Sequence, residues 1–345
     1  MSKVLPDPKA PKESADYVYG KRMEEYEDRQ NFFLNEKVEV KKDEVEEEDK
    51  ETVDGLEALV SRFTSYQTVK VPQLPVEYDG TEGVAKKTID FIVQMAKDLV
   101  DFILNLINNK IARVNLHLNK AEIARKNSGL KTDAVQYPFT IRRLLTPLNP
   151  SVDANWVGSS IDDLKEWYKT VMIAHKTIND IVDSDISRIS NPVEHVVEEI
   201  SKSLGLKDHS GTLQSAVLPS NRRFSIEINT EAPRDFKMYF VNNDAIAKLK
   251  SETFIPTGFL MDNTIKKVRT AIKEIQSNQS TVSQLYRKFE KKVRQLENEK
   301  ESLTQAERSF YSWVIQFDRR LLSSNLQYVM QGLESGIDFV NAGVK

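Results

Sequence analysis

Apolar residues recur every three to four positions over several long stretches of the chain, which is the spacing of one face of an α-helix. The longest stretch predicts a helix over residues 82–126. Its apolar stripe consists of Ile89, Ile92, Val93, Ala96, Leu99, Val100, Ile103 and Ile107. A second helix is expected from Ser160 to a point before Pro192. A shorter helix over residues 193–204 should follow Pro192 and end at Gly205.

The most regular pattern lies near the C-terminus. Apolar residues alternate three and four positions apart from Ile265 to Leu296, through successive heptads, and similar stripes continue to Val340. Thr304 and Glu307 have the spacing of a capping box, which predicts a chain reversal near residues 302–304 and an antiparallel helical hairpin. Because neither Gly nor Pro marks this turn, a single longer helix is the alternative.

Strict alternation of apolar and polar residues occurs between Arg223 and Val241. It predicts one β-hairpin around Pro233, with residues 216–218 as a candidate third strand. The expected fold class is therefore mainly α: an elongated bundle of long amphipathic helices, with a C-terminal heptad-patterned helical hairpin and one small β-hairpin.

Charge divides the chain unevenly. Residues 1–55 hold 17 Asp and Glu against 10 Lys and Arg, a net charge of −7. The remaining residues hold 35 Asp and Glu against 39 Lys and Arg, a net charge of +4. The acidic run over residues 36–54 has few large apolar side chains, so we expect it to be disordered or a fraying helix. The expected segments are an acidic tail or propeptide (1–57), a proline-marked linker (58–81), a helical region (82–222), the hairpin and a connector (223–258) and the C-terminal helices (259–345).

Composition limits the chemistry that the chain can perform. It has no cysteine, so thiolate catalysis, iron–sulfur clusters and cysteine-based zinc sites are excluded, and its four histidines lack the close spacing of local metal sites. Glycine-rich phosphate loops, zinc-protease and serine-hydrolase motifs are also missing from the sequence. Three groups of helix-borne carboxylates are best explained as solvated faces: Asp162 and Asp163; Asp180, Asp183 and Asp185; and Glu194, Glu198 and Glu199 beside His195. We therefore predict no catalytic, cofactor-binding or metal-binding residue and no enzymatic activity, although a hydrolase using scattered carboxylates is a further alternative.

Basic residues are concentrated in residues 265–294, which contain nine Lys and Arg and two acids. They are Lys266, Lys267, Arg269, Lys273, Arg287, Lys288, Lys291, Lys292 and Arg294. A second basic group extends from Lys110 to Arg143. Such stripes can follow a phosphate backbone without reading its sequence, but the outer positions of any helical bundle are also charged, and both interpretations stay open.

The order of these parts resembles the internal head proteins, or virion structural proteins, of large-genome tailed bacteriophages. The resemblance covers roughly residues 56–345. It includes the long helix running into basic sequence, the segment RFSIEINTEAPRDFKMYFV, the helix entry Ile255-Pro256-Thr257-Gly258 and the C-terminal segment LQYVMQGLESGIDFVNAGVK. It implies a non-enzymatic protein of the capsid interior, present in the host cytoplasm during assembly, with other capsid or internal head proteins as partners and packaged DNA as a non-specific one.

Members of this family are processed by a prohead protease. It cuts after a glutamate that lies two positions after a small residue. Gly55, Leu56 and Glu57, followed by Ala58, fit this pattern at the end of the acidic tail. The alternative function is a peripheral membrane-binding or membrane-remodelling protein that uses the helix around residues 89–107. Charged residues such as Asp90, Lys97 and Asp98 interrupt that stretch, so no stable membrane insertion is expected.

Overall fold

A computed structural model describes residues 81–147, 153–184, 186, 189–228, 235–244, 247–299 and 304–345. The chain divides into two units, Met1–Thr64 and Ser65–Lys345, and every described residue belongs to the second. The expected acidic tail and the linker therefore lie outside the described residues, apart from the last residue of the linker.

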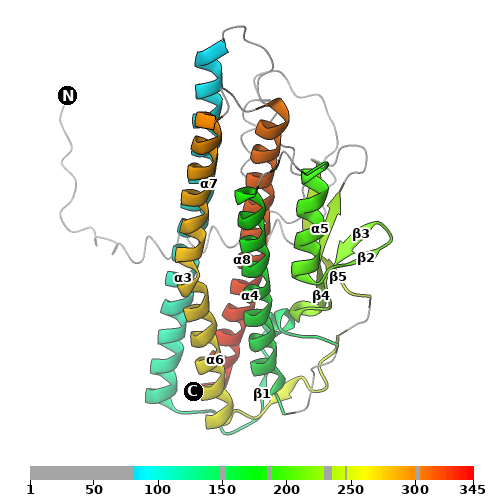
Figure 1. Ribbon diagram of the computed structural model, residues 1–345. Coiled ribbons are helices and arrows are strands. Elements are labelled where there is room, and N and C mark those ends of the chain that lie inside the picture. Colours follow the sequence, from blue (N-terminus) through cyan, green and yellow to red (C-terminus); the bar gives the residue numbers. More distant parts are fainter. Residues whose placement is uncertain are drawn as a thin grey trace, which may run out of the picture. The chain divides into compact units, whose positions relative to one another are not determined.

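Long helices lie side by side and form the main body of this unit (Figure 1). They are α3 (Thr81–Ser128), α4 (Trp156–Asp183), α6 (Gly258–Ser277), α7 (Gln279–Glu299) and α8 (Gln305–Gly343). A shorter helix, α5 (Pro192–Leu204), packs on α4, and a 3-10 helix, η1 (Phe139–Arg143), packs on α8. The apolar stripe predicted for α3 is buried from Ile92 to Ile107, because α3 packs along α7 and α8.

Local capping explains several helix ends. Pro192 occupies the first turn of α5, and Gly205 ends that helix in the left-handed conformation, with φ of 63°. Thr304 and Glu307 form the expected capping box, since the Thr304 side chain accepts from the Glu307 backbone and Glu307 accepts from the Thr304 backbone. The side chain of Thr257 caps α6 by accepting from the backbone N–H of Leu260. The sequence predictions for Pro192, Gly205 and the Thr304–Glu307 capping box are confirmed.

The predicted fold class is wrong in its β structure. The described residues contain two antiparallel sheets, with strand orders β2-β3-β4-β5 and β1-β6, rather than one hairpin. The strands are β1 (Val135–Gln136), β2 (Lys207–His209), β3 (Thr212–Gln214), β4 (Arg222–Ile228), β5 (Phe236–Asn242) and β6 (Thr253–Phe254). The hairpin β4–β5 matches the predicted one, and its register pairs Phe224 with Phe240 and Ile226 with Met238.

The third strand of the larger sheet is β3, not residues 216–218. Those residues lead into the turn Pro219–Asn221, and Leu218 makes an isolated bridge to Arg222. Strands β2 and β3 are joined through Ser210 and Gly211, both with positive φ, which is the geometry of a tight hairpin turn. The three residues of β2 are all exposed, so the strand carries no apolar alternation for a sequence pattern to reveal.

An aromatic cluster fixes the larger sheet against α8. Phe236 of β5 lies 5.1 Å, between ring centroids, from Phe317, and Phe240 stacks on Tyr328 at 4.2 Å. The hydroxyl of Tyr328 donates to the backbone oxygen of Pro219. Because a lone hairpin is only marginally stable in water, this packing on a helix is what holds the strands.

The C-terminal helices do not form a separate hairpin. The heptad pattern is divided at Asn278, which ends α6, and α7 packs mainly on α3 and α4, while α8 packs mainly on α3 and α4 as well as α6. The expected inward positions Ile265, Ile272, Val282 and Phe289 are buried, whereas the side chain of Leu296 lies outside the described residues. Helix α8 is apolar on more than one side, so it is surrounded by the bundle and is not paired with one helix.

Candidate nucleic-acid interface

The nine basic residues of 265–294 lie on α6 and α7, and acids neutralise four of them. Lys267 Nζ lies 2.6 Å from Asp162 of α4, and Arg269 Nη2 lies 2.5 Å from Glu122 of α3. The other two pairs are Lys288 with Asp180, at 3.9 Å, and Arg294 with Glu290, at 3.0 Å. These cations connect helices or stabilise their own helix, so they are less available to a partner than the sequence suggested.

The other five residues have no ion-pair partner within the described part of the chain. They are Lys266, Lys273, Arg287, Lys291 and Lys292. All are exposed except Lys292, which is half-buried. On α7, Arg287 and Lys291 lie one turn apart and away from the buried positions Phe289 and Val293. We call these five residues the basic surface.

The second basic group serves largely internal contacts. Arg113 pairs with Glu334 at 3.4 Å and Arg125 with Asp262 at 3.3 Å. Lys131 donates to the backbone oxygen of Ala342 at the end of α8. Arg113, Arg125 and Lys131 therefore attach α3 and the segment after it to α6 and α8, and we do not include these three residues in the interface.

The carboxylates considered as catalytic candidates do not converge. Asp162 and Asp180 hold lysines of α6 and α7, and Glu198 and Glu199 both pair with Lys202 on the surface of α5. Asp185 lies outside the described residues. Within the described ranges, no three His, Asp or Glu side chains are placed to hold a metal ion.

Sequence reasoning missed a buried polar pair between α4 and α8. His175 Nδ1 lies 2.9 Å from Asp318 Oδ1 and 3.0 Å from Oδ2, and the two side chains are 0% and 1% exposed. Nearby, Trp167 Nε1 donates to Asn325 Oδ1 at 2.8 Å. His175 falls on the apolar stripe of α4, and that position could have indicated a buried role. Because solvent does not reach the pair, it serves the packing of the bundle.

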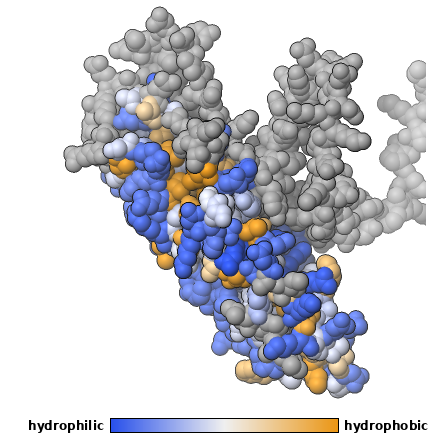
Figure 2. All heavy atoms as spheres, turned by 90° about the vertical axis from the view of Figure 1, so that its right-hand side faces the viewer, coloured by the Kyte–Doolittle hydropathy of each residue, from blue (hydrophilic) through white to orange (hydrophobic). Residues whose placement is uncertain are grey.

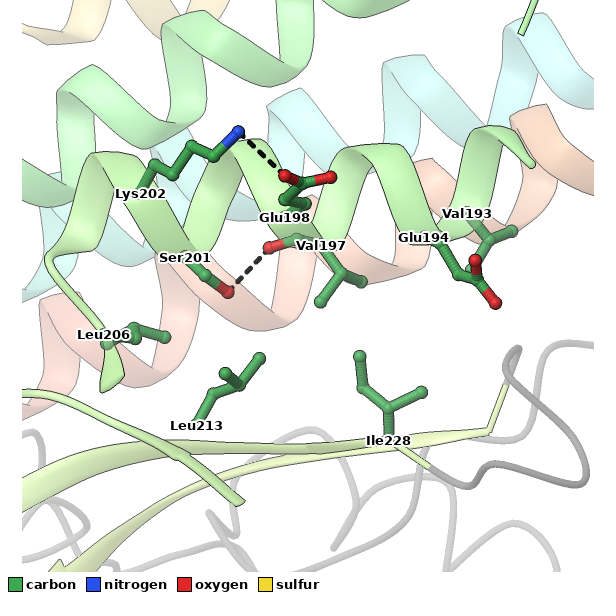
Figure 3. Close-up of a pocket in the computed structure, with 9 residues that line it drawn as sticks. All are labelled: Val193, Glu194, Val197, Glu198, Ser201, Lys202, Leu206, Leu213 and Ile228. Carbon is green, nitrogen blue, oxygen red and sulfur yellow. Dashed lines mark hydrogen bonds and ion pairs between the residues drawn. The ribbon is translucent and has the colours of Figure 1, made fainter. Parts of the chain in front are cut away.

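A pocket of about 400 Å³ lies between α5 and the larger sheet (Figure 3). Val193, Val197, Leu206, Leu213 and Ile228 supply its apolar walls. Glu194, Glu198 and Lys202 lie on its α5 side, where the ion pair of Glu198 with Lys202, at 2.9 Å, occupies two of these charges. Ser201, which also lines the pocket, donates to the backbone oxygen of Val197 within α5.

The side of the molecule that bears α5 and the sheet is mostly hydrophilic in the coloured part of its surface (Figure 2). Hydrophobic residues appear there in separate spots between the hydrophilic ones (Figure 2). In the part of the chain that the structure describes, no helix is both long and apolar enough to cross a membrane.

The described unit is thus a helical bundle with two small antiparallel sheets. Comparison of the chain with protein-family models, with curated proteins and with solved structures found no match. The candidate processing site at Gly55, Leu56, Glu57 and Ala58 lies outside the described residues.

Proposed function

We propose that this chain is a non-enzymatic virion protein of a tailed bacteriophage, packaged inside the capsid head, where it contacts DNA without sequence preference. The observation that carries the DNA contact is the basic surface of α6 and α7, whose five cations have no acid partner among the described residues. The virion assignment rests on the sequence resemblance. Removal of the acidic tail after Glu57 by a prohead protease is part of the same proposal.

The spacing of the cations suits an extended polyanion. Helix α7 continues in the direction of α6 (Figure 1), and at 1.5 Å per residue Lys266 and Lys291 are separated by roughly 37 Å along the helices. Each phosphate that a cation neutralises releases counterions, so five contacts would make log K fall with log salt with a slope of about −4.5. No base-reading geometry is needed for such binding.

The membrane alternative has less support. The apolar side of α3, which it required, faces the core, with Ile92, Ile103 and Ile107 at most 1% exposed. A lipid bilayer would have to compete with α7 and α8 for that side. Co-sedimentation with anionic vesicles should therefore be weak and, where it occurs, sensitive to salt.

The DNA contact is tested by titrating the full chain into two duplexes of unrelated sequence over a series of salt concentrations. The triple variant Lys273→Gln, Arg287→Gln, Lys291→Gln should lose affinity equally for both duplexes and flatten the salt slope by about three units. The matched control, Lys202→Gln, Lys207→Gln, Lys250→Gln, removes the same charge from α5, β2 and the loop before β6. Equal behaviour of the two triple variants would contradict the assigned surface.

The virion assignment is tested by mass spectrometry of purified native particles. The expected result is a species beginning at Ala58. Particles that lack the protein would refute the assignment, and particles that retain residues 1–57 would refute the processing step.

A further inference from the structure

Glu122 places a carboxylate beside the basic surface, near the C-terminal end of α3. Its Oε2 lies 2.5 Å from Arg269 Nη2 of α6, and its Oε1 lies 3.2 Å from Lys126 Nζ, one turn further along α3. Arg269 Nη2 also donates to Asn119 Oδ1 at 3.4 Å. The side chain of Glu122 is 30% exposed, so the carboxylate is reachable from solvent between two helices.

The position is continuous with the free cations of α6. Lys266 precedes Arg269 by three residues and Lys273 follows it by four, so the three side chains share one face of the helix. Lys266 and Lys273 are exposed, and Arg269 is held by Glu122. The Glu122 carboxylate, which contacts Arg269, therefore lies within the row of α6 cations along which we propose that DNA binds.

We propose that the Glu122 carboxylate occupies a phosphate-binding position, formed by Arg269 and Lys126, which a DNA phosphodiester takes over on binding. The inference rests on the proposed function. A carboxylate and a phosphodiester each offer two anionic oxygens to a guanidinium group, so one can replace the other at Arg269. Until it is displaced, Glu122 competes with DNA for two cations and weakens the complex.

The electrostatics of the group agree with this role. Hydrogen bonding to Lys126, together with the positive charges of Arg269 and Lys126, holds the pKa of Glu122 below its usual value. The carboxylate therefore stays charged at neutral pH. Displacement requires another anion and not a proton.

The test is Glu122→Gln in the full chain, which keeps the size of the side chain and removes its charge. Freeing Arg269 and Lys126 should raise the affinity for duplex DNA at low salt and steepen the salt slope by about one to two units, at about 0.9 per cation. The matched control is Glu198→Gln on α5, which removes the same charge and releases Lys202 from one of its two acids. Thermal melting confirms that both variants remain folded.

A second variant identifies the cation involved. Adding Arg269→Gln to Glu122→Gln should cancel at least half of the gain in slope, whereas adding Lys250→Gln to Glu122→Gln, which restores the same net charge from an exposed loop residue, should leave the gain in place. The proposal is overturned if Glu122→Gln and Glu198→Gln bind alike, if the gain survives the loss of Arg269, or if the two double variants lose the gain equally. In each case wild-type binding stands, and with it the proposed function; absence of DNA binding by every form at low salt would overturn both.

Discussion

His175 of α4 faces Asp318 of α8 inside the bundle, with Nδ1 2.9 Å from Oδ1 and almost no solvent exposure on either side chain. The second ring nitrogen, Nε2, has no hydrogen-bond partner in the described part of the chain. Removing the carboxylate and the imidazole from water costs free energy. The hydrogen bond between the two groups offsets part of that cost. The pair therefore ties the register of α4 to that of α8.

Removing one partner should be strongly destabilising. Asp318→Ala leaves His175 buried and unpaired, and we expect a loss of about 3–5 kcal/mol in the free energy of unfolding. In a double-mutant cycle with His175→Ala, the coupling energy should exceed about 1 kcal/mol, measured by chemical denaturation. Glu198→Ala, which breaks an exposed pair on α5, is the control and should leave the denaturation midpoint unchanged. Additive single losses at positions 175 and 318 would show that the two residues do not act together.

Two glycines of α8 allow it to approach α4 closely. A Cβ added at Gly336 would lie 2.8 Å from Ile161 Cδ1, and one added at Gly332 would overlap Leu164 Cδ1. Both partners are fully buried, so they have little room to move. Helix α8 therefore needs glycine at these positions, even though glycine weakens a helix.

Gly332→Ala should destabilise the protein despite its better helix propensity. Overpacking typically costs about 1–3 kcal/mol, against a propensity gain of up to about 1 kcal/mol. Gly258→Ala is the control, because its Cβ would meet only the flexible end of Arg125, at 3.1 Å. Thermal denaturation of the two variants should separate them, and a Gly332→Ala protein as stable as the wild type would mean that α4 and α8 move apart freely.

The helices were predictable from sequence because their patterns are local. Ile92 to Ile107 repeat within one helix, and caps such as Gly205 and Thr304 act within a few residues. The sheets were predictable only in the hairpin β4–β5, since β1 pairs with β6 from a distant part of the chain and β2 has no apolar position. Likewise, nothing local shows that Asp162 neutralises Lys267 or that Glu122 neutralises Arg269, so the sequence overstated the free basic charge.

Two buried tyrosines predict sensitivity to alkali. Burial raises the pKa of both Tyr168 and Tyr328 well above the ordinary value for tyrosine. Above about pH 10, these two tyrosines lose their protons in the unfolded chain but keep them in the folded chain. The free energy of unfolding is therefore unaffected by them below that pH and falls as pH rises above it.

This loss can be followed by tyrosinate absorbance and by the free energy of unfolding across the alkaline range. Tyr168→Phe removes one of the two ionisable groups and should make stability fall less steeply with pH. Tyr328→Phe should do the same, but from a lower starting stability because it also loses the hydrogen bond to Pro219. An unchanged slope in Tyr168→Phe would show that this hydroxyl ionises equally in both states.

Under the proposed function, the acidic N-terminal segment should weaken DNA binding in the full chain. Residues 1–55 carry a net charge of −7, and residues 265–294 carry nine cations and two acids, so the two regions have opposite net charges. A tethered polyanion is present at high effective concentration and competes with phosphates for the same cations. A chain of residues 58–345 should therefore bind non-specific duplex DNA more tightly than the full chain. The difference in affinity should be largest at low salt and small at physiological salt, where charges are screened.

Titration of both forms into one duplex at the two salt concentrations measures this difference. Equal affinity of the two forms at low salt would show that the segment does not compete, and its acidic charge would then have another role.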